Sequence, residues 1–294
     1  MTASDEDPLI FDRRVVRLHR DRAARSQELV AGIADDLGAR LLDRLDDVQR
    51  SFTTALDIGG RGAVASALRA RGTEVVSCDL SLPMARQAGG LPVCADEEFL
   101  PFGPGSFDLI VACASLHWVN DLPGTLAQIR YALKPDGLFL ACIPVLPTLS
   151  PLRHALVSAE DTLRGGASAR VSPFPTLRDC AGLMQRAGFA LPVADQETLT
   201  LQYRTAHGLL KDLRAAGETS ALRQRERSIP SRALFPLTLA RLEENGPPEI
   251  QLHMAMISGW APAASQPQPL KPGAFTTSLS DILDSLPEPE DRPS

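Results

Sequence analysis

The sequence is poor in the features by which several classes of protein are recognised. Aromatic residues make up only 5% of its 294 residues, and acidic residues outnumber basic ones, so that the formal net charge is −6. A general nucleic-acid-binding protein needs a basic surface, and a single-strand binder needs aromatic side chains on which bases stack. The composition therefore argues against a nucleic-acid partner of either kind.

Cysteine pairs and long apolar runs are also missing. None of the five cysteines belongs to a CxxC pair, and most lie in apolar, strand-like runs that are typical of buried, reduced thiols. We therefore expect a reducing compartment, the cytoplasm. No apolar run is long enough for a transmembrane helix. The first ten residues hold three acids and no basic segment, so we expect no signal peptide.

The densest motif is the segment 54–63, which reads TALDIGGRGA. Its first five residues are apolar or β-branched except Asp57 and predict a buried strand, and a glycine turn and a helix follow. Glycine permits positive φ and a close approach of backbone to a ligand. A glycine turn alone is more often only a tight turn. In this context Gly59, Gly60 and Gly62 predict a nucleotide-type element that turns backbone N–H groups and a helix N-terminus toward a ligand.

Acidic residues follow the next two predicted strands. Asp79 ends the second strand, close to the spacing of about 20 residues at which a carboxylate binds ribose hydroxyls. Asp96 and Glu97 follow the third strand, where ligands bind in open α/β sheets, and Asp96 can accept a hydrogen bond from an adenine amino group. The alternatives are a strand-end turn residue for Asp79 and a solvated acidic loop for the other two.

Predicted strands alternate with predicted helices, which indicates an α/β fold with a mostly parallel sheet. The clearest strand is the apolar run 107–114, and residues 134–137, KPDG, predict a turn before a fifth strand at 138–143. We expect a helical cap over 1–50, a binding domain over 51–261 with a mostly helical insertion at about 204–248, and a flexible tail over 262–294.

Six arginines lie between residues 13 and 25, in a segment with the rough apolar face of an amphipathic helix. One interpretation is that they form a solvated face. The other is that they form a basic lid over an anionic substrate or an acidic protein substrate.

Taken together, the glycine turn, the acids after strands two and three, and KPDG before strand five resemble class I S-adenosylmethionine (SAM)-dependent methyltransferases over roughly residues 50–260. That resemblance implies a Rossmann-like fold with a mostly parallel seven-stranded sheet, helices on both faces, and SAM as cofactor. The residues that it assigns to SAM are Asp57, Gly59, Gly60, Gly62, Asp79, Asp96, Glu97 and Leu116.

A narrower resemblance is to the respiratory complex I assembly factor 5 family, which includes a mitochondrial protein regarded as an arginine hydroxylase of a complex I subunit. The segments that carry it are 11–13, 95–102, 116–122, 133–137, 171–174, 217–218 and 259–260. A wider relative is the malonyl-carrier-protein methyltransferase of biotin synthesis. The resemblance implies a protein substrate, such as a complex I subunit, and leaves the oligomeric state open.

The glycine turn departs from the methyltransferase pattern. Aligned without a gap, Arg61 and Ala63 occupy glycine positions, and alternatively one residue is missing from the turn. Pro144 to Pro147 also replace a two-glycine segment that is common after strand five in this family. Both departures suggest that the cofactor is held differently or weakly.

His117, just after strand four, is the candidate for substrate orientation or proton acceptance, and a structural histidine is the alternative. No metal site is expected, because His19 and Asp21 point apart on a helix and no zinc spacing exists. Three functions remain open: a protein-modifying enzyme in complex I assembly, a methyltransferase on a small molecule or carrier protein, and a non-catalytic scaffold.

Overall fold

The computed structural model describes residues 9–266 and divides the chain into two units, Met1–Pro262 and Ala263–Ser294. Everything below concerns the first unit. The predicted flexible tail, residues 262–294, lies almost entirely outside the described residues.

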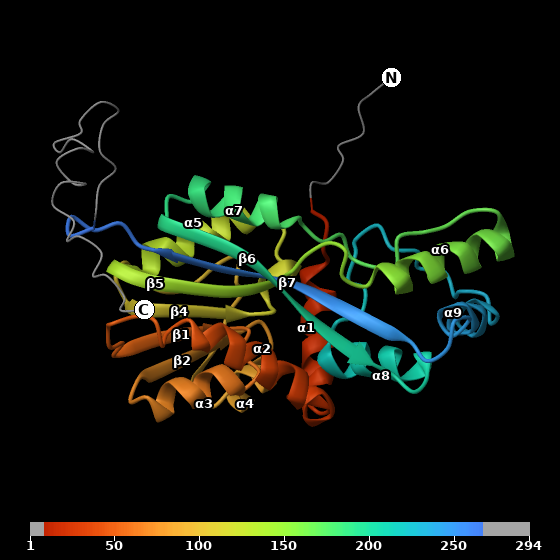
Figure 1. The fold of residues 1–294 in the computed structure, drawn as a ribbon, viewed down its shortest axis with the longest axis horizontal. Coiled ribbons are helices and arrows are strands. Elements are labelled where there is room, and N and C mark those ends of the chain that lie inside the picture. Colours follow the sequence, from red (N-terminus) through yellow and green to blue (C-terminus); the bar gives the residue numbers. More distant parts are fainter. Residues whose placement is uncertain (1–8, 267–294) are drawn as a thin grey trace, which may run out of the picture. The chain divides into compact units, whose positions relative to one another are not determined.

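A single sheet organises this unit (Figure 1). Its strands are β1 Thr54–Ile58, β2 Glu74–Asp79, β3 Leu91–Cys94, β4 Phe107–Cys113, β5 Leu133–Pro144, β6 Ala190–Gln202 and β7 Glu249–Trp260. They lie in the order β3-β2-β1-β4-β5-β7-β6. The strands β1 to β5 pair with one another in parallel, and β7 is antiparallel to both β5 and β6. The predicted mostly parallel seven-stranded sheet is confirmed.

Helices cover both faces of the sheet. They are α1 Arg13–Ala23, η1 Gln27–Val30, α2 Ala31–Asp43, α3 Ala63–Ala70, α4 Leu82–Gln87, η2 Leu116–Trp118, α5 Leu122–Ala132, α6 Ser150–Arg164, α7 Leu177–Arg186, α8 Ala206–Ala216 and α9 Leu234–Leu242. One apolar cluster joins the sheet to α5 and α7, and the other joins it to α2 and α3. Side chains alternate across a strand, so Ile110 of β4 belongs to the first cluster and Leu109 to the second.

Helices also gather beyond the ends of the parallel strands. In Figure 1, α1 lies across these ends, and α6, α8 and α9 lie further out on the same side. The β6–β7 ladder continues past the last β5 pair, Pro144 with Met254, and reaches these helices. A third apolar cluster joins α6, α8 and β7 there. This region covers the strand ends where an open α/β sheet binds ligands.

Three parts of the chain differ from the prediction. The KPDG segment is not a separate turn, because β5 begins at Leu133 and contains the segment as an irregularity with Asp136 at φ +62°. The segment 204–248 is less helical than predicted, since residues 217–233 lie between α8 and α9 without helix. The helix α6 was not predicted, although Leu152 and Leu156 have the i, i+4 spacing of a buried face.

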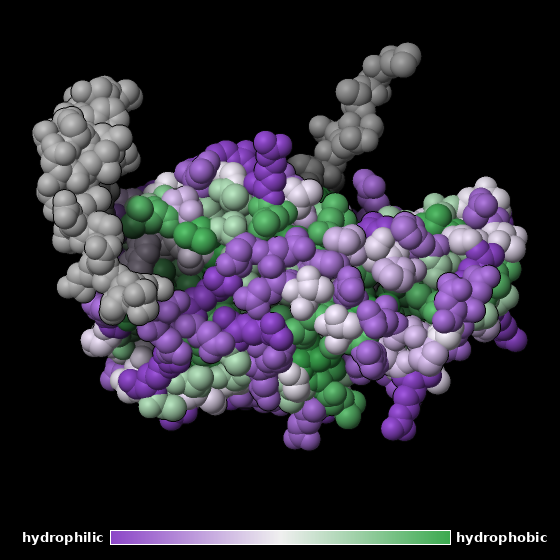
Figure 2. Space-filling view, in the orientation of Figure 1, coloured by the Kyte–Doolittle hydropathy of each residue, from purple (hydrophilic) through white to green (hydrophobic). Residues whose placement is uncertain are grey.

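Polar side chains cover most of the face shown in Figure 2, with a hydrophobic area over the lower part of α1. Leu18 and Leu29 are exposed in this part of the chain. Within residues 9–266, no helix is both long and apolar enough to cross a membrane.

Candidate functional site

The glycine turn closes tightly on the protein itself. Gly59 has φ +67°, and a Cβ at this position would overlap the side chain of Ser115 in the loop after β4. A Cβ at Gly60 would overlap the carboxylate of Asp57. Gly60 is therefore required for close approach rather than for a positive φ, whereas Gly62, at φ +96°, precedes α3 in a left-handed conformation.

The carboxylate of Asp57 is fully buried at the end of β1, and neither of its oxygens has a hydrogen-bond partner among the described residues. Burial, together with the nearby charge of Asp79, raises the pKa of Asp57 from 3.8 to about 7. A buried acceptor without a donor is costly, so a donor from a ligand would fit this position.

Asp79, Asp96 and Glu97 come together around two arginines of α1. The side chain of Arg20 is 2% exposed, and its Nη1 bonds both Asp79, at 3.3 Å, and Glu97. Arg13 bonds Asp96, at 2.5 Å, and Glu97. Glu97 is fully buried and lies between the two guanidinium groups, so the alternative of a solvated acidic loop is wrong for this residue.

The two buried carboxylates titrate in opposite directions. Burial alone would raise the pKa of Glu97, but the charges of Arg20 and Arg13 outweigh burial and hold that pKa at about 2. Burial raises the pKa of Asp79, and its single, longer contact with Arg20 only partly opposes that effect. Glu97 is therefore the ionised centre of the cluster.

These contacts correct the prediction for the arginine-rich helix. Arg13 and Arg20 point inward and neutralise the acidic cluster, so neither a fully solvated face nor a basic lid describes them. The remaining arginines of the segment, Arg14, Arg17, Arg22 and Arg25, are exposed. The sequence pattern missed the inward pair because both readings treated the six charges alike.

The N-terminus of α1 is held by several contacts around Phe11. The Phe11 ring meets Trp118 edge-on with centroids 5.2 Å apart, and its backbone bonds the side chain of Asn120 in both directions. Phe11 also forms a β-bridge with Leu222. Asp12 caps the helix by accepting the backbone N–H groups of residues 14 and 15.

His117 lies in η2, just beyond β4, with its side chain 4% exposed. Its Nε2 is 2.8 Å from Glu218 Oε2, which also accepts the indole N–H of Trp118 at 2.9 Å. Arg61 reaches the other oxygen of Glu218 at 3.0 Å. Leu116, next to His117, is buried in the core.

Glu218 is the ionised partner in this group. Burial would raise its pKa, but His117, Arg61 and Trp118 together lower it to about 2. An ionised carboxylate only accepts hydrogen bonds, so His117 donates from Nε2. Its Nδ1 is buried and lacks a partner in the described part of the chain, and in a neutral imidazole it is an acceptor. This arrangement suits a proton acceptor oriented by a carboxylate.

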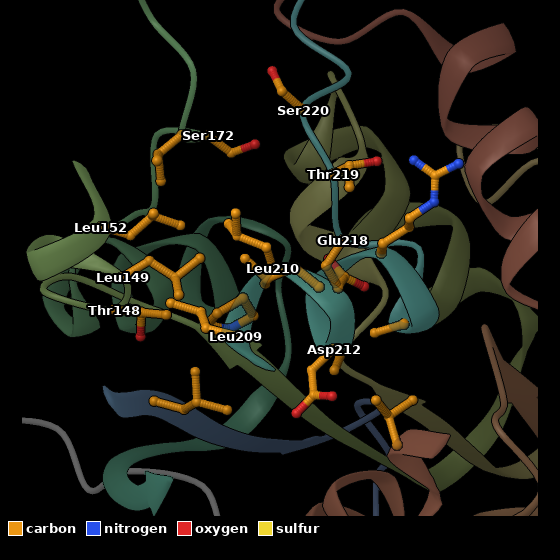
Figure 3. Close-up of a pocket in the computed structure, with 18 of the residues that line it drawn as sticks. Thr148, Leu149, Leu152, Ser172, Leu209, Leu210, Asp212, Glu218, Thr219 and Ser220 are labelled. Carbon is orange, nitrogen blue, oxygen red and sulfur yellow. The ribbon is translucent and has the colours of Figure 1, made fainter. Parts of the chain in front are cut away.

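A cavity of about 680 Å³ lies beside this group, between the strand ends and α6, α8 and α9. His117, Trp118, Glu218 and Arg61 line one part of it, and leucines of α6 and α8 line another. Figure 3 shows Leu149, Leu152, Leu209 and Leu210 projecting toward the space that Glu218, Thr219 and Ser220 border. The cofactor candidates Asp79, Asp96 and Glu97 do not line it.

Comparison with known proteins identifies the family. A model described as "Methyltransferase domain" matches residues 56–141. The arginine-hydroxylase NDUFAF5, mitochondrial, of Rattus norvegicus is 35% identical over 93% of this chain and 83% of its own. The malonyl-[acyl-carrier protein] O-methyltransferase of Xylella fastidiosa (strain M23) is 32% identical over 80% and 81%. This chain belongs to the class I SAM-dependent methyltransferase superfamily.

A solved structure agrees on the fold. The YcgJ protein from Bacillus subtilis superposes with a TM-score of 0.51 at 17% identity, covering 78% of this chain and 98% of its own. At that identity the likeness concerns the fold alone.

A methyltransferase domain implies SAM binding, and two observations in this methyltransferase-like fold support a ligand at the glycine turn: the unpartnered Asp57 carboxylate and the space that only glycine leaves at position 60. The acidic cluster does not fit a nucleoside in this conformation. Asp79 is 1% exposed and bonded to Arg20, and Asp96 is bonded to Arg13. In this arrangement the α1 arginines take up the oxygens that would meet a nucleoside.

Sequence reasoning missed four residues of the site, which are Arg13, Arg20, Arg61 and Glu218. Glu218 was one of the residues that carried the family resemblance, and Arg61 was a departure from it, so both had a signal. Arg13 also lies in a segment that carried the resemblance, 11–13. Arg20 had no signal, because an arginine that neutralises a buried acid looks the same in sequence as one that faces solvent.

Proposed function

We propose that this protein is a SAM-binding enzyme that modifies another protein during the assembly of respiratory complex I. The observation that carries the proposal is the 35% identity, along most of both chains, with a relative named as an arginine hydroxylase. The geometry supports an enzyme, because His117 and its orienting Glu218 border a cavity at the strand ends. The proposed location, which follows from the lack of cysteine pairs in the sequence, is the cytoplasm.

In this proposal, α1 controls access to the cofactor. SAM supplies a methyl group that is already activated, so the protein has mainly to bind and align its substrates. Asp79 can meet ribose hydroxyls only after Arg20 leaves, and Asp96 can meet an adenine amino group only after Arg13 leaves. The SAM-bound state therefore has α1 displaced from the position seen here.

The experiment compares intact masses of candidate complex I subunits after incubation with the protein and SAM. Addition of a methyl group supports methyl transfer. Addition of one oxygen atom supports hydroxylation, for which dioxygen and a two-electron reductant are added, so that the second oxygen atom leaves as water. A subunit whose mass is unchanged, although calorimetry shows SAM binding, would overturn the protein-modifying function.

A second candidate is methyl transfer to a small or carrier-bound acyl molecule, as in the Xylella fastidiosa relative. The apolar lining of the cavity favours it. A third candidate is a non-catalytic assembly scaffold. It is favoured by the acidic cluster, because Arg20 already bonds Asp79 and Glu97. It requires that no SAM bind, so the calorimetric titration separates it from the other two.

A further inference from the structure

The cavity beside His117 has two unlike ends, and the difference indicates the chemistry of its ligand. Its volume, about 680 Å³, lies within the usual range of small-molecule pockets, roughly 300–1,000 Å³. The apolar end is built from a buried leucine cluster of α6 and α8, which includes Leu149, Leu152 and Leu209. A ligand that fills this end must be largely apolar.

Three buried side-chain atoms with no partner among residues 9–266 belong to residues that line the cavity: His117 Nδ1, Gln27 Oε1 and Ser220 Oγ. They come from three separate segments that meet through contacts. The amide of Gln27 donates to the backbone oxygen of Arg61, Arg61 bonds Glu218, and Glu218 bonds His117. Three such atoms around one network indicate a polar head of the ligand at this end.

The kind of hydrogen bond that the head makes follows from these atoms. Gln27 Oε1 is an acceptor, and in a neutral imidazole whose Nε2 donates to Glu218, Nδ1 of His117 is an acceptor too. Ser220 can accept or donate. A head that carries O–H or N–H donors satisfies all three atoms, whereas an ionised carboxylate offers only acceptors.

The charged residues of this network, Arg61 and Glu218, are matched to each other. Arg61 and Glu218 lie 3.0 Å apart and form an ion pair. Neither member of this pair is free to neutralise a charged head. A cationic or anionic head would therefore lose its hydration without gaining a counter-charge, which is unfavourable. An arginine side chain has the right donors, but it is cationic, and its short aliphatic stem would leave most of the leucine wall uncovered.

We infer that this cavity binds a small molecule with a long apolar body and an uncharged head that donates hydrogen bonds, such as a long-chain alcohol or a phenol. The inference goes beyond the proposed function, because it concerns the ligand that fills the leucine-lined end of the cavity. It requires that a modified protein side chain reach His117 without filling that end.

The first test needs no variant. N-phenyl-1-naphthylamine, which is apolar and carries one N–H donor, is titrated into the full chain and its fluorescence is followed. Dodecanol, dodecanoate, dodecylamine and an arginine-containing peptide then compete with it. We expect saturable one-to-one binding, and displacement by dodecanol at concentrations about tenfold lower than by either charged analogue. Equal displacement by dodecanoate, or displacement by the peptide alone, would overturn the inference.

The second test locates the probe. Leu210→Trp adds bulk to the cavity and should weaken probe binding by about tenfold, because the apolar body loses its space. Leu163→Trp places the same bulk on the outer part of α6, away from the cavity lining, and should leave binding unchanged. If both variants bind like the wild type, the probe sits elsewhere and the assignment of the cavity is wrong.

The proposed hydrogen bond between Ser220 and the polar head of the ligand is tested with a matched pair of serine substitutions. Ser220→Ala should weaken dodecanol binding about threefold or more and change dodecanoate binding little, because a hydroxyl partner is removed. Ser228→Ala, in the same segment but outside the cavity lining, is the control. Equal effects of the two substitutions would contradict a polar head at Ser220.

Discussion

Arg20 in α1 and Asp79 at the end of β2 form an ion pair in which each side chain is only 2% exposed, with Nη1 and Oδ2 3.3 Å apart. In an open α/β sheet, the residue at the end of β2 is the one that meets the ribose of a nucleotide. In the proposed function, an element from the N-terminal part of this chain therefore occupies the acid that would hold the ribose. Binding of α1 and binding of the cofactor would then compete for one carboxylate.

The first prediction concerns Asp79 itself. Asp79→Asn keeps the shape of the side chain but weakens the acceptors for ribose hydroxyls, and each charge-assisted bond contributes about 1.5–3 kcal/mol. We expect SAM affinity, measured by calorimetry, to fall about tenfold or more. Asp46→Asn, a similar change at an exposed acid that pairs with Arg71, should have no effect. Equal SAM affinity in a folded Asp79→Asn protein would show that this acid does not hold the ribose.

The second prediction concerns the competing arginine. Arg20→Met removes the guanidinium and leaves Asp79 and Glu97 buried without it, a kind of change that costs about 3–5 kcal/mol. We expect a lower melting temperature together with tighter SAM binding, because the acid is released. A purely structural defect would lower both the melting temperature and the SAM affinity, so it would not produce these opposite effects.

Arg17→Met provides the matched control, because Arg17 lies on the same helix, is 57% exposed, and has only a 3.9 Å contact with Asp21. It should change neither property beyond about 0.5 kcal/mol. If Arg20→Met weakens SAM binding, α1 is part of the cofactor site rather than its competitor.

Much of the fold follows from local patterns. Apolar, β-branched runs such as residues 107–114 become buried strands because only a covered sheet accommodates them. Asp57, Asp79 and Asp96 lie at consecutive parallel strand ends, which meet at one edge, so their proximity was predictable. The direction in which Arg13 and Arg20 point was not. It depends on tertiary contacts of Phe11 with Trp118 and Leu222, which no local spacing reveals.

The role of Glu218 shows a second limit of the sequence. It lies about a hundred residues from its partner His117, in a non-helical segment between α8 and α9. A histidine next to a strand end is visible in the sequence, but the carboxylate that orients it is brought in by the fold. Resemblance to a family pointed to Glu218, whereas spacing could not.

The third prediction tests the close approach in the glycine turn. Gly60→Ala places a methyl group against the carboxylate of Asp57, and either the turn or the acid must shift. Overpacking of this kind typically costs about 1–3 kcal/mol, so the melting temperature should fall. Asp57→Ala removes the obstacle, and in the double variant the cost of Gly60→Ala should largely disappear. Additive effects in thermal melts of the four proteins would contradict a direct clash.

The last prediction concerns the pH dependence of stability that Asp57 creates. Its pKa is raised from 3.8 to about 7 in the folded protein, because burial disfavours the charged form and Asp79 adds a nearby negative charge. In this interval the folded state holds a proton that the unfolded state has lost, so stability falls as pH rises from about 4 to about 7 and levels off above. The contribution is at most about 4 kcal/mol. Asp57→Asn removes it.

Urea unfolding of the wild type and Asp57→Asn, at a series of pH values from about 4 to about 8, measures this difference. As the pH rises across this interval, the free energy of unfolding of the wild type should fall relative to that of Asp57→Asn, because only the wild type must bury a charge at the higher pH. Asp46→Asn again serves as the control, since Asp46 is exposed. A gap that stays constant with pH would mean that Asp57 is ionised throughout and that its carboxylate has a partner in solution.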